Sequence, residues 1–396
     1  MEKLISLFYE KYATIKTEQI RGFINTIDWT NRFIGIKGSR GVGKTTLLLQ
    51  YIRLTFKPDK RVLYISLDHF YFLENNLYDV VADFYKKGGE FIAIDEVHKY
   101  ANWATEIKNI YDDMPNLRLV FTGSSLLHIH QGKADLSRRV VVYDMPGLSF
   151  REYLQFESKQ QLNIYSVEQI VKNHVSIAIE IAQKIKPLHY FSNYLQHGYY
   201  PFYMENVQSF HKKLNEILLT VLEVDIPQYA AVQPSNVVML KKLMAVISNA
   251  VPFKPNMNSI SERTGISLNT MKNYLNLLKD AQLLHLLYKE DKGINSLSKP
   301  EKIYLHNTNL MYNLVMNPEE GNIRETFFFN QVSQVSEVYA SVPADFYVEG
   351  RYTFELGGKQ KKQKQIKNLS EAYIVKDNIE IGTDVNIPLW LFGFLY

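Results

Sequence analysis

Cysteine is absent from the sequence, which excludes disulfide bonds and thiolate metal sites and fits a reducing compartment. The formal net charge is only +4, so no field of the whole chain directs it to nucleic acid or a membrane surface. Long apolar runs are also lacking. The last one, Ile387–Tyr396, is far shorter than the ~20 residues that a membrane helix needs, and it predicts a buried terminal strand. The first residues include Glu2 and Glu10 and offer no signal-peptide cleavage site. We therefore expect a cytoplasmic protein without a membrane partner.

The composition is that of a globular protein, with 46% hydrophobic and 22% charged residues among 396. Residues 31–144 alternate short apolar runs with helix-compatible stretches, the pattern of a doubly wound parallel α/β sheet. The expected strands are Phe33–Lys37, Arg61–Asp68, Phe91–Asp95, Leu117–Gly123 and Arg139–Met145. The expected helices between them are Lys44–Phe56, Asn76–Lys87, Ala104–Met114 and Ser125–Gln131.

The segment Gly38–Thr45, GSRGVGKT, fits the phosphate-binding pattern G-x-x-x-x-G-K-[ST] at every fixed position. It follows an apolar strand and opens a helix, so backbone N–H groups and the helix dipole would face phosphate oxygens. Lys44 would reach the β- and γ-phosphates, and the Thr45 hydroxyl would bind Mg²⁺. The alternative is a glycine-rich turn that matches by chance. We predict ATP and Mg²⁺ as cofactors, held by Gly38, Ser39, Arg40, Gly41, Val42, Gly43, Lys44, Thr45 and Thr46.

Two acids follow the apolar strand Phe91–Asp95, as FIAIDE. A buried strand that ends in adjacent carboxylates can deliver them to a phosphate site, where Asp95 would hold Mg²⁺ and Glu96 would polarise the attacking water. The alternative is a strand end with ordinary surface acids. We expect another strand to separate this one from the strand before the P-loop, because that order is typical of ATPases with a catalytic glutamate.

Small hydroxyl residues end the next strand, LVFTGSS. One of them can lie beside the γ-phosphate and orient water there. Ser124 is the first choice and Thr122 the second, while an ordinary strand-to-helix turn with an N-cap is the alternative.

Two arginines, Arg138 and Arg139, precede the fifth strand. Either could stabilise charge on the γ-phosphate, from the same chain or from a neighbouring subunit of a homo-oligomer, and position favours Arg139. Surface arginines without such a role are the alternative.

At this point the chain resembles a known family, the AAA+-type ATPases of bacteria and archaea that carry a C-terminal domain of unknown function. The resemblance rests on Gly38–Leu48, on Ile94–Trp103 with its His98, on Phe121–Leu127 and on Gly147–Leu154. It extends over essentially the whole chain and implies ATP hydrolysis, followed by winged-helix and nuclease-like parts. Relatives often have Leu-Ala-Gly-Arg where this chain has Leu136–Arg139, which leaves the identity of the arginine finger open.

The segment Ser259–Leu287 predicts a helix-turn-helix, with Gly265 in the turn and Ser267 as an N-cap. The residues Tyr288–Leu297 could form a wing. Outward-facing residues at the start of the second helix would be Asn269, Thr270, Lys272 and Asn273. Because few residues here are basic, DNA contact and a packing or dimerisation role stay equal alternatives.

The last segment places Glu325 on a helix, then Asp345, Glu355 and Lys359, an order that resembles PD-(D/E)xK nucleases. In those enzymes two carboxylates bind Mg²⁺ and a lysine activates water. Here Gly357 stands where the lysine belongs, so Lys359 could substitute only if the chain bends back. We favour a degenerate nuclease fold over an active one, and Asp345 with Glu355 is a tentative second metal site. The run Lys359–Lys367 could contact nucleic acid or form a solvated face.

These patterns predict a P-loop ATPase domain at 1–150, a helical lid at 151–235, a winged helix at 236–300 and a nuclease-like α/β domain at 301–396. The first functional hypothesis is ATP hydrolysis coupled to the C-terminal module, with DNA as one candidate partner. The second is a Mg²⁺-dependent DNA nuclease regulated by ATP. The third is a switch that holds nucleotide and signals without significant hydrolysis.

Overall fold

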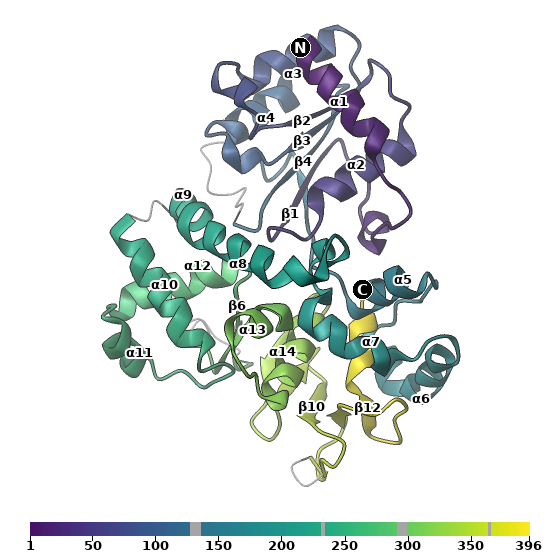
Figure 1. Cartoon of the computed structure of the whole chain (residues 1–396), viewed down its shortest axis with the longest axis vertical. Helices are drawn as coiled ribbons and strands as arrows, with labels where there is room; N and C mark the ends of the chain where they lie inside the picture. Colours follow the sequence, from purple (N-terminus) through teal and green to yellow (C-terminus); the bar gives the residue numbers. More distant parts are fainter. Residues whose placement is uncertain (127–135, 231–233, 291–298, 363–365) are drawn as a thin grey trace. The chain divides into compact units, whose positions relative to one another are not determined.

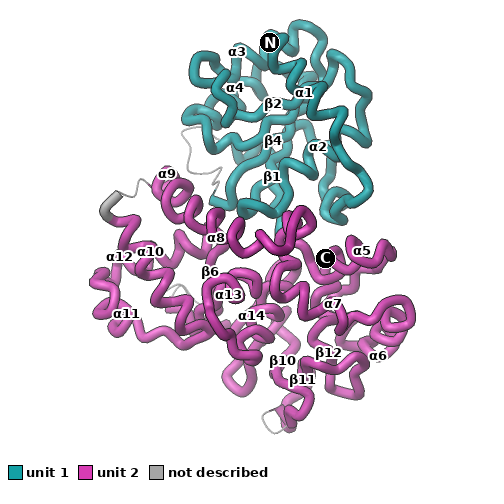
Figure 2. Tube along the Cα trace, in the orientation of Figure 1, with its two compact units in different colours: residues 1–146 teal, residues 147–396 magenta. Residues whose placement is uncertain are grey.

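The computed structural model describes residues 1–126, 136–230, 234–290, 299–362 and 366–396. The chain divides into two compact units, residues 1–146 and 147–396 (Figure 2). The division lies close to the first expected boundary, near residue 150. The expected boundaries near 235 and 300 stay predictions. None of the helices in the described ranges is both long and apolar enough to span a bilayer.

The first unit is built on a five-stranded parallel sheet in the order β2-β3-β4-β1-β5 (Figure 1). The expected five strands are confirmed, with β1 to β4 largely buried and β5 partly exposed. β4 separates β3 from β1, as predicted for an ATPase with a catalytic glutamate. The strands are β1 Phe33–Gly38, β2 Val62–Ser66, β3 Phe91–Asp95, β4 Arg118–Ser124 and β5 Val141–Asp144.

Helices α2, α3 and α4 follow β1, β2 and β3, and α1 precedes the sheet and packs on β2. The α3 sequence shows why, since Leu77, Val80, Val81 and Phe84 recur at helical spacing and are all buried. The fourth expected helix, Ser125–Gln131, falls largely outside the described residues. The helices are α1 Glu2–Thr14, α2 Lys44–Thr55, α3 Leu77–Lys86 and α4 Trp103–Asp113, with 3₁₀ turns η1 Gly22–Asn25, η2 Phe70–Leu73 and η3 Val97–Lys99.

The second unit begins with helices, as expected, and ends in a small mixed sheet. Its first helices are α5 Phe150–Ser158, α6 Val167–Lys184, α7 Pro187–Asn193, α8 Phe210–Thr220 and α9 Ile226–Ala230, with single turns η5 Tyr194–Gly198, η6 Pro201–Met204, η7 Val207–Ser209 and η8 Val221–Asp225. Serine hydroxyls cap α5 and α6 in complete capping boxes, which fixes where both helices begin.

The middle of this unit has the order helix, helix, helix, strand, strand. These elements are α10 Pro234–Ser248, α11 Met257–Thr264, α12 Leu268–Asp280 and the antiparallel pair β6 Leu284–Leu287 and β7 Lys302–Leu305. Gly265 ends α11 in the left-handed conformation, at φ 73°, and the Ser267 hydroxyl caps α12, as expected. Most of the expected wing lies outside the described residues. The interpretation as a winged helix belongs to the proposal below.

The final sheet has the order β12-β11-β10-β9-β8, antiparallel at β8, β9 and β10 and parallel from β10 to β12. Its strands are β8 Val338–Ala340, β9 Phe346–Val348, β10 Tyr352–Gly357, β11 Ala372–Lys376 and β12 Asn386–Pro388. The helices α13 Thr308–Leu314 and α14 Glu320–Val332 precede it in the chain.

The buried terminal strand predicted for Ile387–Tyr396 is wrong. The strand β12 ends at Pro388, and Leu389–Phe394 forms the 3₁₀ helix η11, whose side chains are all buried. A short run that is apolar at every position has neither strand nor helix periodicity, so its pattern could not decide between them.

Candidate nucleotide site

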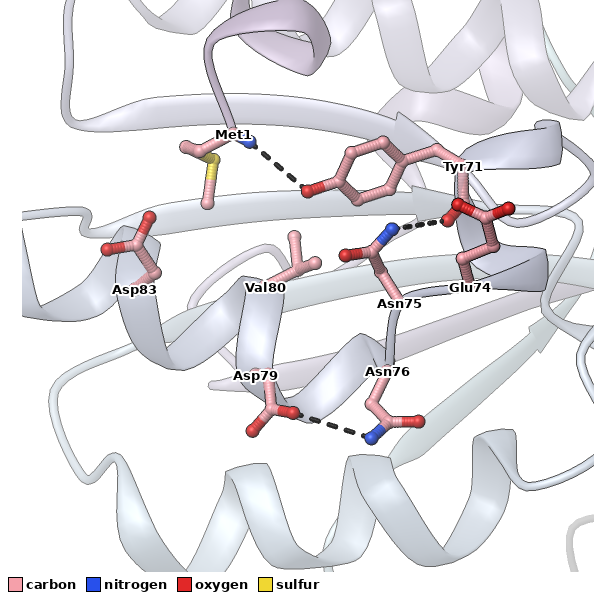
Figure 3. A pocket seen from close by; sticks show the side chains of 8 residues that line it. All are labelled: Met1, Tyr71, Glu74, Asn75, Asn76, Asp79, Val80 and Asp83. Atoms are coloured by element: carbon pink, nitrogen blue, oxygen red, sulfur yellow. Dashed lines mark hydrogen bonds between the residues drawn. The ribbon is translucent and has the colours of Figure 1, made fainter.

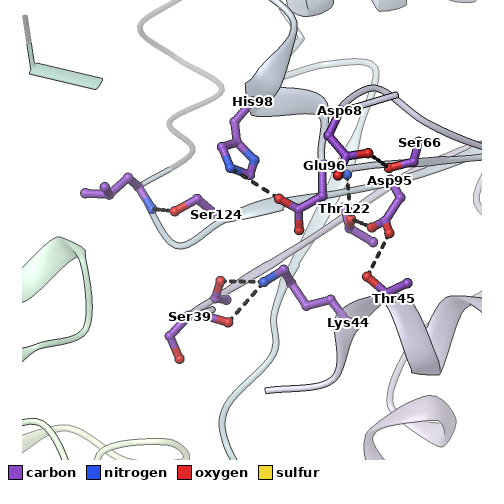
Figure 4. A network of polar contacts seen from close by, with 12 residues as sticks. Ser39, Lys44, Thr45, Ser66, Asp68, Asp95, Glu96, His98, Thr122 and Ser124 are labelled. Atoms are coloured by element: carbon purple, nitrogen blue, oxygen red, sulfur yellow. Dashed lines mark hydrogen bonds and ion pairs between the residues drawn. The ribbon is translucent and has the colours of Figure 1, made fainter. Parts of the chain in front are cut away.

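The P-loop connects the end of β1 to the start of α2 within the first unit (Figure 4). Gly41 and Gly43 have φ values of 87° and 95°, which residues with a Cβ rarely adopt. The turn therefore explains why the phosphate-binding pattern requires glycine at position 43. The Lys44 ammonium donates to the carbonyl oxygens of Gly38 and Ser39, at 2.9 and 3.0 Å. Ser39 and Val42 are buried. The side chain of Lys44, the first residue of α2, therefore folds back onto the carbonyl oxygens of the P-loop.

The first glycine of the loop also packs against the chain. A Cβ at Gly38 would lie 2.4 Å from the Met145 carbonyl oxygen, which belongs to the backbone and cannot rotate away. We predict that Gly38→Ala shifts the loop, lowers the free energy of unfolding by about 1–3 kcal/mol and weakens ATP binding. Urea unfolding and nucleotide titration measure both effects.

Gly321→Ala is the matched control, because a Cβ there meets nothing within 4 Å. Equal stability of the two variants would contradict the predicted clash.

Asp95 is the best-anchored residue of the site. Its carboxylate is buried and accepts hydrogen bonds from Thr45 Oγ1 at 2.7 Å, from Tyr64 OH at 2.8 Å and from the Thr122 hydroxyl. Because Ile94 pairs with Phe121, the next residues of the two strands, Asp95 and Thr122, lie side by side. A hydroxyl and a carboxylate are hard oxygen donors, so Thr45 and Asp95 fit Mg²⁺ chemically.

Glu96 follows in a left-handed backbone conformation, with φ 55° and ψ 44°. Its N–H donates to Thr122 Oγ1 at 3.1 Å, and its carboxylate lies 3.3 Å from His98 Nε2. Burial raises the pKa of Glu96, Lys44 and Arg40 oppose the shift, and the charges of Asp95 and Asp68 add to it. A carboxyl with a raised pKa beside a phosphate site has the character of a general base.

The two hydroxyl candidates of β4 take different places. Thr122, the second choice, is bound to Asp95 and Glu96. Ser124, the first choice, pairs in register with Gly38 of the P-loop, and its hydroxyl accepts from Leu126 N–H at 3.4 Å. Ser124 thus lies beside the first residue of the P-loop, whereas Thr122 holds Asp95 and the backbone of Glu96 in place.

Arg139 does not reach this site within its own chain. Its guanidinium pairs with Asp112, at 2.9 and 3.1 Å, and lies over the Tyr111 ring. The Tyr111 ring packs on Phe33, the first residue of β1, whereas the P-loop follows the last residue of β1. The structure thus pairs Arg139 with Asp112, and a role of either arginine as a finger stays a prediction. Arg138 is exposed.

Sequence reasoning missed Tyr64 and gave His98 no role. Tyr64 comes from β2, which β3 and β4 separate from β1, and burial together with Asp95 raises its pKa far above the usual value. No motif marks Tyr64, and the segment Ile94–Trp103 contains His98 without giving it a role, because only the neighbouring strand or the turn after β3 brings them to the carboxylates.

A separate hollow of about 270 Å³ in the first unit shares no residue with the P-loop (Figure 3). Its lining includes Glu74, Asp79 and Asp83 beside Asn75 and Asn76. Three carboxylates would repel phosphate, so this hollow is not the nucleotide site.

The carboxylates of the second unit form another polar cluster. Lys302 Nζ lies 3.0 Å from Glu325 Oε2 and 3.6 Å from Asp345 Oδ1, and Tyr304 OH donates to the same Glu325 oxygen at 2.6 Å. Asp345 accepts from Leu356 N–H at 2.8 Å. Two acids of the predicted site, Glu325 and Asp345, therefore contact a lysine that the sequence did not single out.

The third acid, Glu355, is buried and pairs with Lys361 rather than with the expected Lys359. Lys361 N–H donates to the Gly358 carbonyl in a tight turn, and its side chain crosses Gly357, where a Cβ would lie 2.6 Å away. The chain does bend back, but two residues later than predicted. Burial raises the pKa of Glu355, and Lys361 opposes the shift. Across the described residues, no group of three Asp, Glu or His side chains lies close enough to hold a metal ion.

Comparisons with known proteins agree with the first unit. Residues 30–154 match the family described as AAA domain, and residues 188–321 match a domain of unknown function. The whole-chain resemblance is thus supported in part, since residues 1–29, 155–187 and 322–396 lie outside both matches. No curated protein matches the sequence.

Three solved structures are similar to parts of the chain. C. elegans PCH-2 has 17% identity over 44% of this chain and 47% of its own, with a TM-score of 0.26. AMPPCP-bound DnaA from Aquifex aeolicus has 14% identity over 70% of this chain and 88% of its own, with a TM-score of 0.26. A DNA replication initiation factor has 14% identity over 70% of this chain and 92% of its own, with a TM-score of 0.25. The family match and the sheet order show that the first unit holds an AAA-type α/β P-loop domain, which supports nucleotide binding.

Proposed function

We propose that the first unit binds ATP with Mg²⁺ and hydrolyses the bond between the β- and γ-phosphates. The observation that carries the proposal is the 2.7 Å contact between the Thr45 hydroxyl and the Asp95 carboxylate, which joins the P-loop to the acidic strand. Lys44 and Glu96 lie at the same edge of the sheet. These are the groups that phosphoryl transfer to water requires.

Each residue has a distinct task in this mechanism. The N–H groups at the start of α2 and the Lys44 ammonium bind the phosphate oxygens, and Lys44 leaves its two carbonyl partners to do so. Thr45 and Asp95 would hold Mg²⁺, which would supply positive charge to the phosphate oxygens. Tyr64 and Thr122 keep Asp95 oriented. Glu96 accepts a proton as water attacks the γ-phosphorus, and the bond to the leaving ADP breaks.

We predict that Glu96→Gln lowers kcat for ATP by about 10²–10⁴-fold, because the amide keeps the shape of the side chain but cannot accept the proton. Nucleotide affinity should change little. Steady-state turnover of wild type and variant, with and without duplex DNA, measures this. Equal rates would instead support the switch that holds nucleotide without significant hydrolysis.

The same measurement tests the proposed coupling to DNA. The observation that favours DNA is the exposure of Asn269, Lys272 and Asn273 on α12, the helix that would enter a groove. Lys359, Lys362 and Lys367 are exposed as well, whereas Lys361 is bound to Glu355 and Lys364 lies outside the described residues. Acceleration by DNA supports a DNA-coupled ATPase. A Glu96-dependent rate that ignores DNA points to a protein partner.

An arginine finger is part of the proposal only from a neighbouring copy in a homo-oligomer. Arg138 is exposed, where a neighbouring copy can contact it, and it is the arginine that we test. Loss of turnover in Arg138→Ala, restored by mixing with a Lys44→Ala variant that still carries Arg138, would support a finger in trans.

A second candidate is Mg²⁺-dependent DNA cleavage in the second unit. The observation that favours it is that the charges of Asp345 and Glu325 act on Glu355, which pairs with Lys361. Against it, Lys302 already neutralises two of these acids. Cleavage of single- or double-stranded DNA that is lost in Asp345→Ala would establish this activity, and its absence leaves the cluster with a structural role.

A further inference from the structure

His98 lies at the nucleotide site without a part in the mechanism above. Its Nε2 lies 3.3 Å from Oε2 of Glu96, and only 15% of its side chain is exposed, against 22% for Glu96 (Figure 4). Half-buried polar groups in contact interact more strongly than exposed ones, because less water screens them. The contact is thus placed where it can orient the proposed base.

The backbone shows how two residues so close in sequence come to face each other. Glu96 takes a left-handed conformation and the 3₁₀ turn η3 follows at once, so the chain reverses direction after β3. Val97 is fully buried and anchors the turn, and Glu96 N–H is held by Thr122. A left-handed non-glycine residue costs about 1–3 kcal/mol and persists only where its surroundings fix it. The position of His98 is therefore set by the fold and not by a free loop.

The surrounding charges leave the Glu96 carboxylate with competing neighbours. Lys44 and Arg40 attract it, and Asp95 and Asp68 repel it. A base pulled toward the Lys44 ammonium would lie on the P-loop instead of facing the attacking water. The His98 imidazole contacts Oε2 on the side of the carboxylate away from Lys44 (Figure 4).

We propose that His98 is a positioning residue that holds the Glu96 carboxylate in the orientation from which it accepts the proton of the attacking water. The assignment rests on the proposed ATPase function. His98 touches neither nucleotide nor water in this role and acts through Glu96 alone. It therefore affects the chemical step and leaves ATP binding to the P-loop.

The test is the steady-state ATP turnover of the full chain in wild type, His98→Ala, His98→Gln, Glu96→Gln and the double variant His98→Ala with Glu96→Gln. We expect His98→Ala to lower kcat about tenfold or more, the scale on which outer-shell partners act, with KM within about twofold of wild type. His98→Gln keeps a hydrogen-bond donor and should recover part of the loss. The double variant should be no slower than Glu96→Gln, because residues that act as a unit are not additive.

The controls separate this role from a structural one. His211→Ala removes an exposed imidazole from α8 and should keep the wild-type kcat. Two outcomes overturn the role of His98 and leave the ATPase proposal in place. In the first, turnover depends on Glu96 but His98→Ala does not change it. In the second, His98→Ala lowers turnover by the same factor when Glu96 is already glutamine. A wild-type rate that Glu96→Gln equals overturns the proposed ATPase function and the assignment with it.

Discussion

Replacing Lys44 with alanine is expected to weaken ATP binding by about 10²–10⁴-fold, because each charge-assisted hydrogen bond to phosphate contributes about 1.5–3 kcal/mol and the lysine would make two. In the structure, Lys44 can exchange its present partners for phosphate oxygens. Its ammonium is bound by two backbone carbonyls of the loop, which are neutral and weaker partners than phosphate. Calorimetric titration with ATP and Mg²⁺ measures the affinity.

The control for Lys44→Ala must lose the same charge elsewhere in the first unit. Lys86, exposed in the last turn of α3, meets this requirement. Lys86→Ala should bind ATP as the wild type does. Micromolar affinity retained by Lys44→Ala, in a protein that unfolds at the same urea concentration as the control, would place the nucleotide elsewhere.

The sequence sufficed where one local pattern determines one local structure. Gly41 and Gly43 need positive φ values, and a buried strand before two acids leaves few places for Asp95. The same reasoning predicted the strand between β3 and β1, because it follows from the family of sheets that use a glutamate base.

Contacts between distant segments could not be predicted in this way. The sequence places Arg139 near the fifth strand, but only the folded chain shows it bound to Asp112 at the far edge of the sheet. Tyr64 reaches Asp95 from β2, and Lys302 reaches Glu325 from β7. Each of these contacts joins two elements that are distant in the sequence, and a local pattern does not show which distant elements will meet. The turn at Gly358 likewise brings Lys361 to Glu355 in place of Lys359.

Removing Lys302 is expected to give the largest loss of stability in the second unit. Its ammonium contacts Glu325 at 3.0 Å and Asp345 at 3.6 Å, and 19% of each acid side chain is exposed. Lys302→Met keeps the length of the side chain and removes the charge, so both carboxylates lose their counter-ion. A buried pair that loses one partner costs about 3–5 kcal/mol and an exposed pair about 0–1. Because these groups are partly exposed, we expect a loss of about 2–3 kcal/mol.

Hydrogen exchange of the β10 and β11 amides in the full chain reports this loss within the second unit alone. Adding Glu325→Gln should restore part of it, because one of the two uncompensated charges is gone. The matched control is Lys289→Met, whose lysine contacts Glu301 at 3.6 Å with more than half of its side chain exposed, and it should cost little. The result also bears on the second candidate function. If Mn²⁺ restores the protection that Lys302→Met loses and does not change the wild type, the lysine occupies the place of a metal ion, and the cluster is a structural joint between β7 and α14. If Mn²⁺ protects the wild type as well, the three carboxylates bind metal beside the lysine, and the nuclease hypothesis gains support.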